Sequence, residues 1–275
     1  MNSNNAEKRY RMNIRGREFD LSKTTYVMGI LNVTPDSFSD GDLHKTVEDA
    51  VEHALKMAEE GAAIIDIGGE STRPGYEPVS SEEETKRVIP VIEAIRKVSD
   101  IPMSVDTTKH DVAAAAVAAG ADIINSVAGL SSPDEMLDVV RSTGSVFVMT
   151  YENSYVNQFG EALIGMAETA IEAGISPDKI IVDPGIGFGK TVEENLRIVN
   201  ELPVITQIGY PVLLGCSRKS FIRKILNVDT DDALSGTLVT TVLAALAGVG
   251  FVRVHDVKEN VRAVRMLSSI VNTAG

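Results

Sequence analysis

The chain repeats one pattern of hydrophobic and polar positions along its length. A short run of apolar, often β-branched residues is followed by a polar turn and then by a segment whose apolar residues recur three and four positions apart. Short apolar runs of this kind predict strands, and the longer spacing predicts amphipathic helices. The predicted strands are Tyr26–Leu31, Ala63–Ile67, Pro102–Val105, Asp122–Val127, Ser145–Met149, Lys179–Val182, Pro211–Gly215 and Gly250–Val254.

The segments that follow the runs predict helices. Several begin with a residue suited to cap a helix, such as Ser81, which is followed by Glu84 three positions later. The predicted helices are Val47–Glu60, Ser81–Val98, Asp111–Ala119, Pro133–Ser142, Glu161–Ala173, Val192–Asn200, Asp231–Ala247 and Val257–Val271.

Alternation of strand and helix predicts a parallel sheet, and near-continuous apolar strands suit a sheet that is buried on both faces. Eight strand–helix units in about 250 residues match a closed TIM (β/α)8 barrel. A doubly wound open sheet ranks second, because Asn32-Val-Thr-Pro follows the first strand where a dinucleotide-binding fold has a Gly-x-Gly-x-x-Gly loop. We predict an α/β fold: a disordered tail over residues 1–8 and one TIM barrel over residues 9–275, preceded by a short hairpin within Arg9–Leu21.

Composition narrows the function. The 39 acidic residues against 26 basic ones give a net charge of −13, which disfavours a nucleic-acid-binding protein because neutralising phosphates requires clustered Lys and Arg. An anionic ligand must therefore meet a local cluster of cations. The single cysteine, Cys216, excludes an intrachain disulfide. We expect no membrane partner and a cytoplasmic location, because no apolar run could cross a bilayer and residues 1–17 lack the apolar core of a signal peptide.

The active site of a TIM barrel is built from the carboxyl ends of its strands and the loops after them. Three predicted strands carry Asp106, Asn125 and Asp183 there. These acceptor and amide groups suit the edge of a flat heterocycle whose N–H and NH2 groups donate in pairs. We therefore expect a base-like ring as one ligand.

Other strand ends, and the loops after them, carry the cation cluster that an acidic protein needs in order to hold a polyanion. Arginine can grip phosphate oxygens through two parallel hydrogen bonds. The candidate phosphate-binding residues are Arg73, Arg218, Lys219, Arg253 and His255.

Each of these residues also has a purely structural interpretation. Asp183 could cap a turn, Asn125 could satisfy backbone groups, and Arg253 could pair with Asp256. We favour the functional interpretation because acids, amides and bases occupy so many strand ends at once. Cys216 has no histidine placed beside it by sequence, so we expect a packing role rather than a nucleophile. The four scattered histidines offer no recognisable transition-metal site.

Five segments carry a family resemblance. They are MGILNVTPDSFSDG (28–41), DIGGESTRPG (66–75), DPGIGFGK (183–190), SRKS (217–220) and RVH (253–255). Together they resemble dihydropteroate synthase, and the likeness runs from about residue 24 to residue 272. The resemblance implies a TIM-barrel transferase of folate biosynthesis. Its substrates would be 6-hydroxymethyl-7,8-dihydropterin diphosphate and 4-aminobenzoate, with Mg2+ on the diphosphate. It also implies a homodimer and a sulfonamide target.

The resemblance also implies roles for individual positions. The catalytic residues would be Asp36, Arg73, Asp106, Lys219, Arg253 and His255. The pterin would contact Asp106, Asn125, Met149, Asp183, Gly215, Lys219 and Arg253. The diphosphate would contact Asn32, Arg73, Arg253 and His255, with Asn32 also binding Mg2+. The 4-aminobenzoate pocket would contain Phe38, Thr72, Arg73, Pro74, Phe188, Lys219 and Ser220.

The implied mechanism is dissociative: pyrophosphate departs, the pterin delocalises the charge left on its exocyclic methylene, and the aniline nitrogen attacks. Three positions depart from the family pattern: Ser126 replaces the usual Asp, Thr150 the usual His, and Cys216 a common Thr. We expect an active enzyme because the other site residues are present together. The first alternative is a catalytically altered or silent pterin-binding paralogue, and the second is a pterin-dependent methyltransferase.

Overall fold

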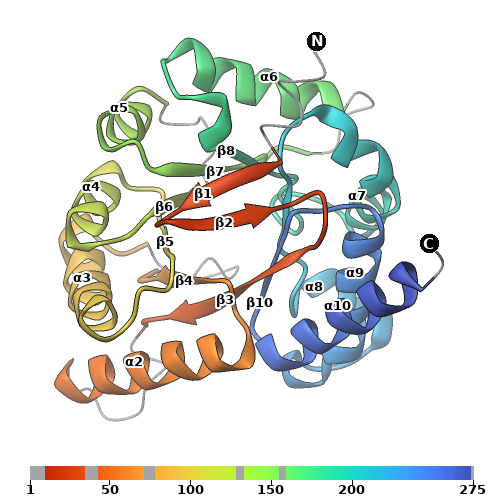
Figure 1. Ribbon diagram of the computed structural model, residues 1–275, viewed down its shortest axis with the longest axis horizontal. Coiled ribbons are helices and arrows are strands. Elements are labelled where there is room, and N and C mark those ends of the chain that lie inside the picture. The colour runs from red at the N-terminus through yellow and green to blue at the C-terminus, as the bar shows by residue number, and fades with distance from the viewer. Residues whose placement is uncertain (1–9, 35–42, 71–77, 128–132, 155–158, 274–275) are drawn as a thin grey trace.

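The computed structural model describes residues 10–34, 43–70, 78–127, 133–154 and 159–273. Eight parallel strands surround one axis, and helices cover them on the outside (Figure 1). The strands are β3 (Tyr26–Asn32), β4 (Ile64–Gly68), β5 (Met103–Asp106), β6 (Ile123–Ser126), β7 (Val146–Thr150), β8 (Ile180–Asp183), β9 (Leu213–Leu214) and β10 (Phe251–Val254).

The strand order closes the sheet into a barrel. The hydrogen-bonded order is β8-β7-β6-β5-β4-β3-β10-β9, and a parallel bridge between Val182 and Val212 joins its two ends. All eight predicted strands and the TIM-barrel fold are confirmed. The seventh strand is shorter than predicted, because only Leu213 and Leu214 pair with β10.

The helices occupy the connections, as the periodicity predicted. They are α2 (Leu43–Glu60), α3 (Ser81–Val98), α4 (His110–Ala119), α5 (Pro133–Thr143), α6 (Phe159–Glu172), α7 (Val192–Ile205), α8 (Ser220–Leu226), α9 (Leu234–Leu246) and α10 (Val257–Asn272). In the described part of the chain, no helix is both long and apolar enough to span a membrane.

Three helix predictions need correction. The cap of α3 is Ser80, whose side chain accepts from the backbone N–H of Glu83, rather than Ser81 with Glu84. The short helix α8 was not predicted, and α9 begins at Leu234 because a 3-10 turn occupies Thr230–Asp232. A full capping box instead starts α7, where Thr191 and Glu194 bond each other's backbone.

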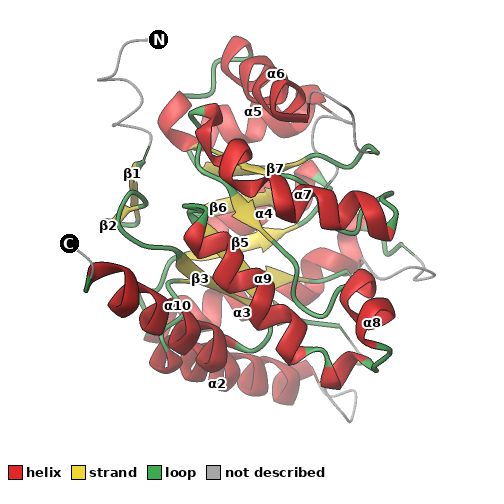
Figure 2. Ribbon diagram, turned by 90° about the vertical axis from the view of Figure 1, so that its right-hand side faces the viewer, coloured by secondary structure: helices red, strands yellow, loops and turns green. Residues whose placement is uncertain are grey.

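The predicted hairpin is present as β1 (Arg11–Ile14) and β2 (Arg17–Asp20), with Arg15 and Gly16 both at positive φ, as a tight hairpin turn requires. Its apolar face packs into one end of the barrel. Met12, Ile14 and Phe19 belong to the same buried cluster as the barrel-lining Ile64 and Phe251. The hairpin thus covers the amino-terminal end of the strands, and α8 lies towards the other end (Figure 2).

Candidate active site

The barrel interior changes from apolar to polar towards the carboxyl ends of the strands. Side chains two residues apart on a strand share a face, so an apolar residue of the inner cluster that stands on a barrel strand is followed two positions later by another inward-facing residue. In five strands these pairs are Ile64 and Asp66, Ile123 and Asn125, Val148 and Thr150, Ile181 and Asp183, and Phe251 and Arg253. The predicted ring-binding residues therefore come together at the carboxyl end of the barrel.

Arg253 is the centre of this polar layer. Its Nε donates to Asp66 Oδ2 at 2.5 Å, and its Nη2 donates to Asp106 Oδ2 at 2.6 Å. The structural alternative, in which Arg253 pairs with Asp256, is wrong, because Asp256 accepts two hydrogen bonds from Arg218 at 2.6 and 3.2 Å. Arg253 therefore pairs with acids that lie near it across the barrel rather than with the acid near it along the chain. Arg218 pairs with Asp256 instead.

The two acids predicted to bind the ring are difficult to ionise. Burial raises the pKa of Asp106 to about 7; Arg253 opposes this rise and the negative charge of Asp66 adds to it. Burial also raises the pKa of Asp183, although the Gly185 backbone N–H donates to its Oδ1 at 2.7 Å. Desolvated acids of this kind bind ring N–H groups strongly, because water does not compete.

Lys219 approaches both acids from the loop after β9. Its Nζ lies 4.1 Å from the centre of the Phe188 ring, close enough for a cation–π interaction. Burial lowers the pKa of Lys219, and the nearby charge of Arg253 lowers it further. The approach depends on Gly187, because a Cβ there would lie 3.0 Å from Lys219 Cδ.

Lys190 ties two loops of the site together and was not predicted. Its Nζ donates to the backbone oxygens of Tyr151, Gly185 and Phe188 at 2.8, 2.9 and 3.2 Å. Burial lowers its pKa to about 8. The loops after β7 and β8 are thus joined through one ammonium group, which also holds the backbone of Phe188, the residue whose ring contacts Lys219.

Of the predicted diphosphate-binding residues, the structure describes Asn32, Arg253 and His255 but not Arg73. Asn32, at the end of β3, and His255, after β10, are both partly exposed. Ser217 Oγ lies 3.0 Å from His255 Nδ1 and accepts from the His255 backbone N–H at 3.2 Å, which holds the histidine beside the loop after β9 that carries Arg218 and Lys219. Arg73 lies outside the described residues.

Five other predicted site residues are either outside the described part of the chain or away from the polar layer. Asp36, Phe38, Thr72 and Pro74 also lie outside the described residues. Met149 is fully buried in the cluster between sheet and helices, on the opposite face of β7 from Thr150. The structure therefore does not bring Met149 into the polar layer, and its contact with pterin stays a prediction.

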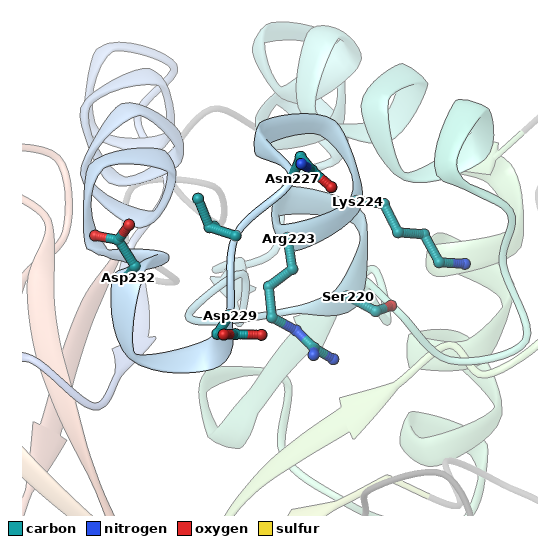
Figure 3. A pocket seen from close by; sticks show the side chains of 7 residues that line it. Ser220, Arg223, Lys224, Asn227, Asp229 and Asp232 are labelled. Carbon is teal, nitrogen blue, oxygen red and sulfur yellow. The ribbon is translucent and has the colours of Figure 1, made fainter.

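Gly215 and Ser220 lie at the edges of the site. Gly215 has no side chain to fill the space near Asp183 and Arg253. Ser220 starts α8 and lines a pocket of about 560 Å3 with Arg223, Lys224, Asn227, Val228, Asp229 and Asp232. The lining residues come from α8 and the segment after it (Figure 3). None of the strand-end acids lines this pocket, so we assign the ring site to the barrel mouth.

A buried ion cluster lies beside the site and escaped the sequence analysis. Lys109 Nζ donates to Glu70 Oε2 and to Glu84 Oε2, both at 2.6 Å, and the Glu84 side chain is fully buried. Glu70 Oε2 also accepts from the backbone N–H of Val79 at 3.0 Å. The cluster therefore joins the loop after β4 to α3 and to the start of α4. One sign of the cluster was present in the sequence: Glu84 stands at a position of α3 that faces the core, where an apolar residue is usual.

The described residues contain neither a metal-binding cluster nor an activated thiol. No group of three or more His, Cys, Asp or Glu side chains is arranged around a common point within the described ranges. Cys216 is buried, and burial raises the pKa of its thiol to about 12, which suits a packing role.

Comparison with known proteins gives the family. Residues 28–255 match the family model described as "Pterin binding enzyme". The dihydropteroate synthase of Clostridium beijerinckii is 46% identical over 94% of this chain and 99% of its own length, and that of Bacillus subtilis is 46% identical over 91% and 90%.

Solved structures agree with this relationship. Xanthomonas albilineans dihydropteroate synthase with 4-aminobenzoic acid superposes with a TM-score of 0.89 and 42% identity, covering 95% of this chain and 98% of that one. The same enzyme in complex with 7,8-dihydropteroate gives a TM-score of 0.86 and 40% identity over 95% and 98%. The barrel, the acids at its strand ends and these relatives lead to one conclusion: the chain belongs to the dihydropteroate synthase family.

Proposed function

We propose that this dihydropteroate synthase condenses 6-hydroxymethyl-7,8-dihydropterin diphosphate with 4-aminobenzoate, giving 7,8-dihydropteroate and pyrophosphate. The observation that carries the proposal is the buried group of Asp106, Asn125 and Asp183, flanked by the cations Lys219 and Arg253. This group offers acceptors to a ring edge and positive charge to an anion at one end of the barrel. The relatives crystallised with 4-aminobenzoic acid and 7,8-dihydropteroate support the same substrates.

The acids and the amide would hold the pterin and exclude water from it. Asp183 would accept from the ring N–H and amino groups, with its second oxygen held by the backbone of Gly185. Asp106 and Asn125 would complete the ring edge. Lys219 would approach the ring from the side of Phe188. Positioning of this kind makes a large contribution to rate when two substrates must meet.

The reaction would be dissociative. Lys219, Arg253 and His255 would stabilise the negative charge that develops on the departing pyrophosphate. The electron-rich pterin would carry the positive charge on its exocyclic methylene until the amine of 4-aminobenzoate attacks. No protein nucleophile is required, in keeping with the raised pKa of Cys216.

We also propose that Mg2+ binds together with the diphosphate, where it would neutralise charge on the leaving group. Among the protein groups, the amide oxygen of Asn32 is a suitable hard ligand. The neighbouring residue on β4 is Gly68, which has no side chain next to this oxygen; a Cβ there would lie 3.7 Å from it. Mg2+ commonly uses one or two protein oxygens and completes its shell with phosphate oxygens and water. This arrangement fits a site without an acidic metal cage.

Two of the three departures from the family pattern, Ser126 and Thr150, replace an ionisable residue, and both are compatible with turnover. Ser126 and Thr150 are both buried and uncharged. Their hydroxyl groups keep the capacity to donate and accept. Asp106, Asn125, Asp183 and the cations around them form the polar layer without a charge at either position.

Pyrophosphate release that depends on both substrates and Mg2+ tests the function. Release that requires 4-aminobenzoate and is inhibited competitively by a sulfonamide is the expected result. Pterin diphosphate binding without release would instead identify a catalytically silent paralogue. Methyl transfer from a methylated pterin would identify the pterin-dependent methyltransferase, which ranks third because Ser217-Arg-Lys and Arg253-Val-His are both present.

We further propose a homodimer in the cytoplasm. The outer face of α9 carries Val239, Leu243 and Leu246, whose exposed fractions are 60%, 43% and 58%. This spacing forms one apolar stripe along a helix, and such a stripe on a barrel surface suits burial against a second copy. The one cysteine of the chain, Cys216, is buried and forms no disulfide, which agrees with a reducing compartment such as the cytoplasm.

A further inference from the structure

The inner face of β4 carries a fully buried carboxylate, that of Asp66, in the middle of the strand sequence Ile64-Ile-Asp-Ile-Gly68. Burying a carboxylate is costly unless it is well paired. Its Oδ1 has no hydrogen-bond partner among the described residues. An apolar residue of similar size would stabilise the barrel at least as well, so the position calls for an explanation other than stability.

The other oxygen of Asp66 makes two hydrogen bonds. Oδ2 accepts from Asn125 Nδ2 at 3.1 Å and from Arg253 Nε at 2.5 Å. One carboxylate oxygen therefore contacts two side chains of the pterin site, on β6 and on β10. Asp66 itself lies one level below the strand ends, at the register position of Ser104 on β5.

These bonds set the orientation of both partners. Because the Asn125 nitrogen faces Asp66, the carbonyl oxygen of the same amide is the group left to meet the ligand. For Arg253, Asp66 holds Nε while Asp106 holds Nη2. Two anchor points on one edge of a planar guanidinium fix its plane.

We propose that Asp66 is a positioning residue of the pterin site, which orients Asn125 and, together with Asp106, fixes the plane of Arg253. The inference rests on the proposed function, because it assigns Asn125 and Arg253 to the pterin. Asp66 acts through these two side chains and is not required to touch the substrate.

Asp66 also couples to the site through charge. Among the described residues, four charged groups act on the pKa of Asp106: Asp66 and Glu84 raise it, and Arg253 and Lys219 lower it. Removing the Asp66 charge therefore lowers the Asp106 pKa. Freeing Arg253 to bind Asp106 alone lowers it further, so both effects have the same sign.

The test is Asp66→Asn, which keeps the shape of the side chain and removes its charge. Binding of 6-hydroxymethyl-7,8-dihydropterin diphosphate with Mg2+ is measured by calorimetry. Its Kd should rise about tenfold or more, the value expected for losing a hydrogen bond to a charged group. The KM for 4-aminobenzoate should change by less than about twofold, since that substrate is assigned to other residues.

A pH profile separates positioning from general damage. The profile of kcat/KM for the pterin substrate reports groups of the free enzyme. If ionised Asp106 is needed to accept from the ring, the acidic limb should move to lower pH in Asp66→Asn. A loss of packing alone would lower activity at every pH without moving this limb.

Ser104→Ala is the matched control, because Ser104 is equally buried, stands beside Asp66 in register and has no hydrogen bond from Oγ among the described residues. It should bind pterin diphosphate as the wild type does. If Asp66→Asn does not fold, Asp66→Ser takes its place, and the same rise in Kd and the same shift of the acidic limb are expected. A folded variant with unchanged Kd and an unmoved limb would overturn the inference. Absent pyrophosphate release by the wild type would instead overturn the proposed function.

Discussion

The ammonium group of Lys219 lies 4.1 Å from the centre of the Phe188 ring. Lys219 thus contacts an aromatic face, and the charges of Asp183 and Asp106 raise its pKa in opposition to the lowering by burial. The loop after β9 therefore carries the cation, Lys219, and the loop after β8 carries the aromatic ring that it contacts, Phe188.

Replacing Lys219 by Met should weaken binding of pterin diphosphate by about 2 kcal/mol or more, as for other buried charge contacts. The fold should be unaffected, since the change lies in a loop rather than in the core. Calorimetry and thermal unfolding give the two readouts. Lys224→Met, on the exposed side of α8, is the control and should leave the affinity unchanged. Equal affinity in both variants would remove Lys219 from the site.

Asp106 makes stability and binding depend on pH in opposite directions. Its pKa is raised from 3.8 to about 7 in the folded protein, so the folded state binds more protons than the unfolded chain between these values. The stability that Asp106 contributes is present at low pH and is lost as the pH rises from about 4 to about 7. Pterin binding should strengthen over the upper part of the same range, because the ionised acid is the acceptor.

Asp106→Asn should abolish this part of the pH dependence and lose pterin affinity. Denaturant unfolding at several pH values, compared with wild type, measures the first effect, and calorimetry measures the second. Glu52→Gln on the exposed face of α2 should keep the wild-type profile. A wild-type profile in Asp106→Asn would contradict the assignment.

Gly185 is required for more than its backbone angle. Its φ is +71°, and a Cβ there would lie 2.0 Å from the backbone oxygen of Tyr151. Gly144 has a similar φ of +66° with nothing within 4 Å of its Cβ position. Gly144→Ala should therefore cost only the conformational penalty of about 1 kcal/mol. Gly185→Ala should cost more and also weaken pterin binding, because the Gly185 N–H holds Asp183. Equal melting temperatures for the two variants would contradict this explanation.

The Lys109 cluster should be essential for stability. Lys109→Met leaves Glu70 and Glu84 facing each other without a cation, and breaking a buried pair in this way costs about 3 kcal/mol or more. Glu84→Gln added to Lys109→Met should recover part of the loss, because it removes the buried charge. Chemical denaturation measures both. The exposed pair of Lys86 with Glu82 is the control, and Lys86→Met should have no measurable effect. A neutral Lys109→Met would show that the cluster is dispensable.

The apolar stripe on α9 should hold two copies together. Sedimentation velocity of the wild type should show a dimer, and Leu243→Lys should shift it towards monomer, because a charge is costly to bury at an interface. Val98→Lys, at an equally apolar position with 60% exposure at the end of α3, should leave the dimer intact. A monomeric wild type would exclude this interface.

Much of the fold could be predicted because its signals are local. Apolar runs and helical periodicity depend on residues close in the chain, so eight strands and most helices were identified. The short helix α8 was missed, because seven residues hold too few apolar positions to show a period. The cap of α3 was misplaced by one residue, since Ser80 and Ser81 are both good caps.

The candidate site could be predicted in part. Asp106, Asn125 and Asp183 were identified because parallel strands bring their carboxyl ends together. Asp66 was missed as a functional residue because it lies within an apolar strand, one level below the ends. Lys109, Glu70 and Glu84 belong to three separate segments, and no spacing along the chain indicates that they meet.

The sequence by itself determined the alternation of strand and helix, and the two-residue period that turns Asp66, Asn125, Asp183 and Arg253 inward. Only the tertiary structure decided how these groups pair. Arg253 bonds Asp66, 187 positions away, and leaves Asp256, three positions away, to Arg218. The reason is geometric: on a strand, Arg253 points into the closed barrel, where side chains from other strands are its nearest neighbours. Ion pairing follows that distance and not separation along the chain.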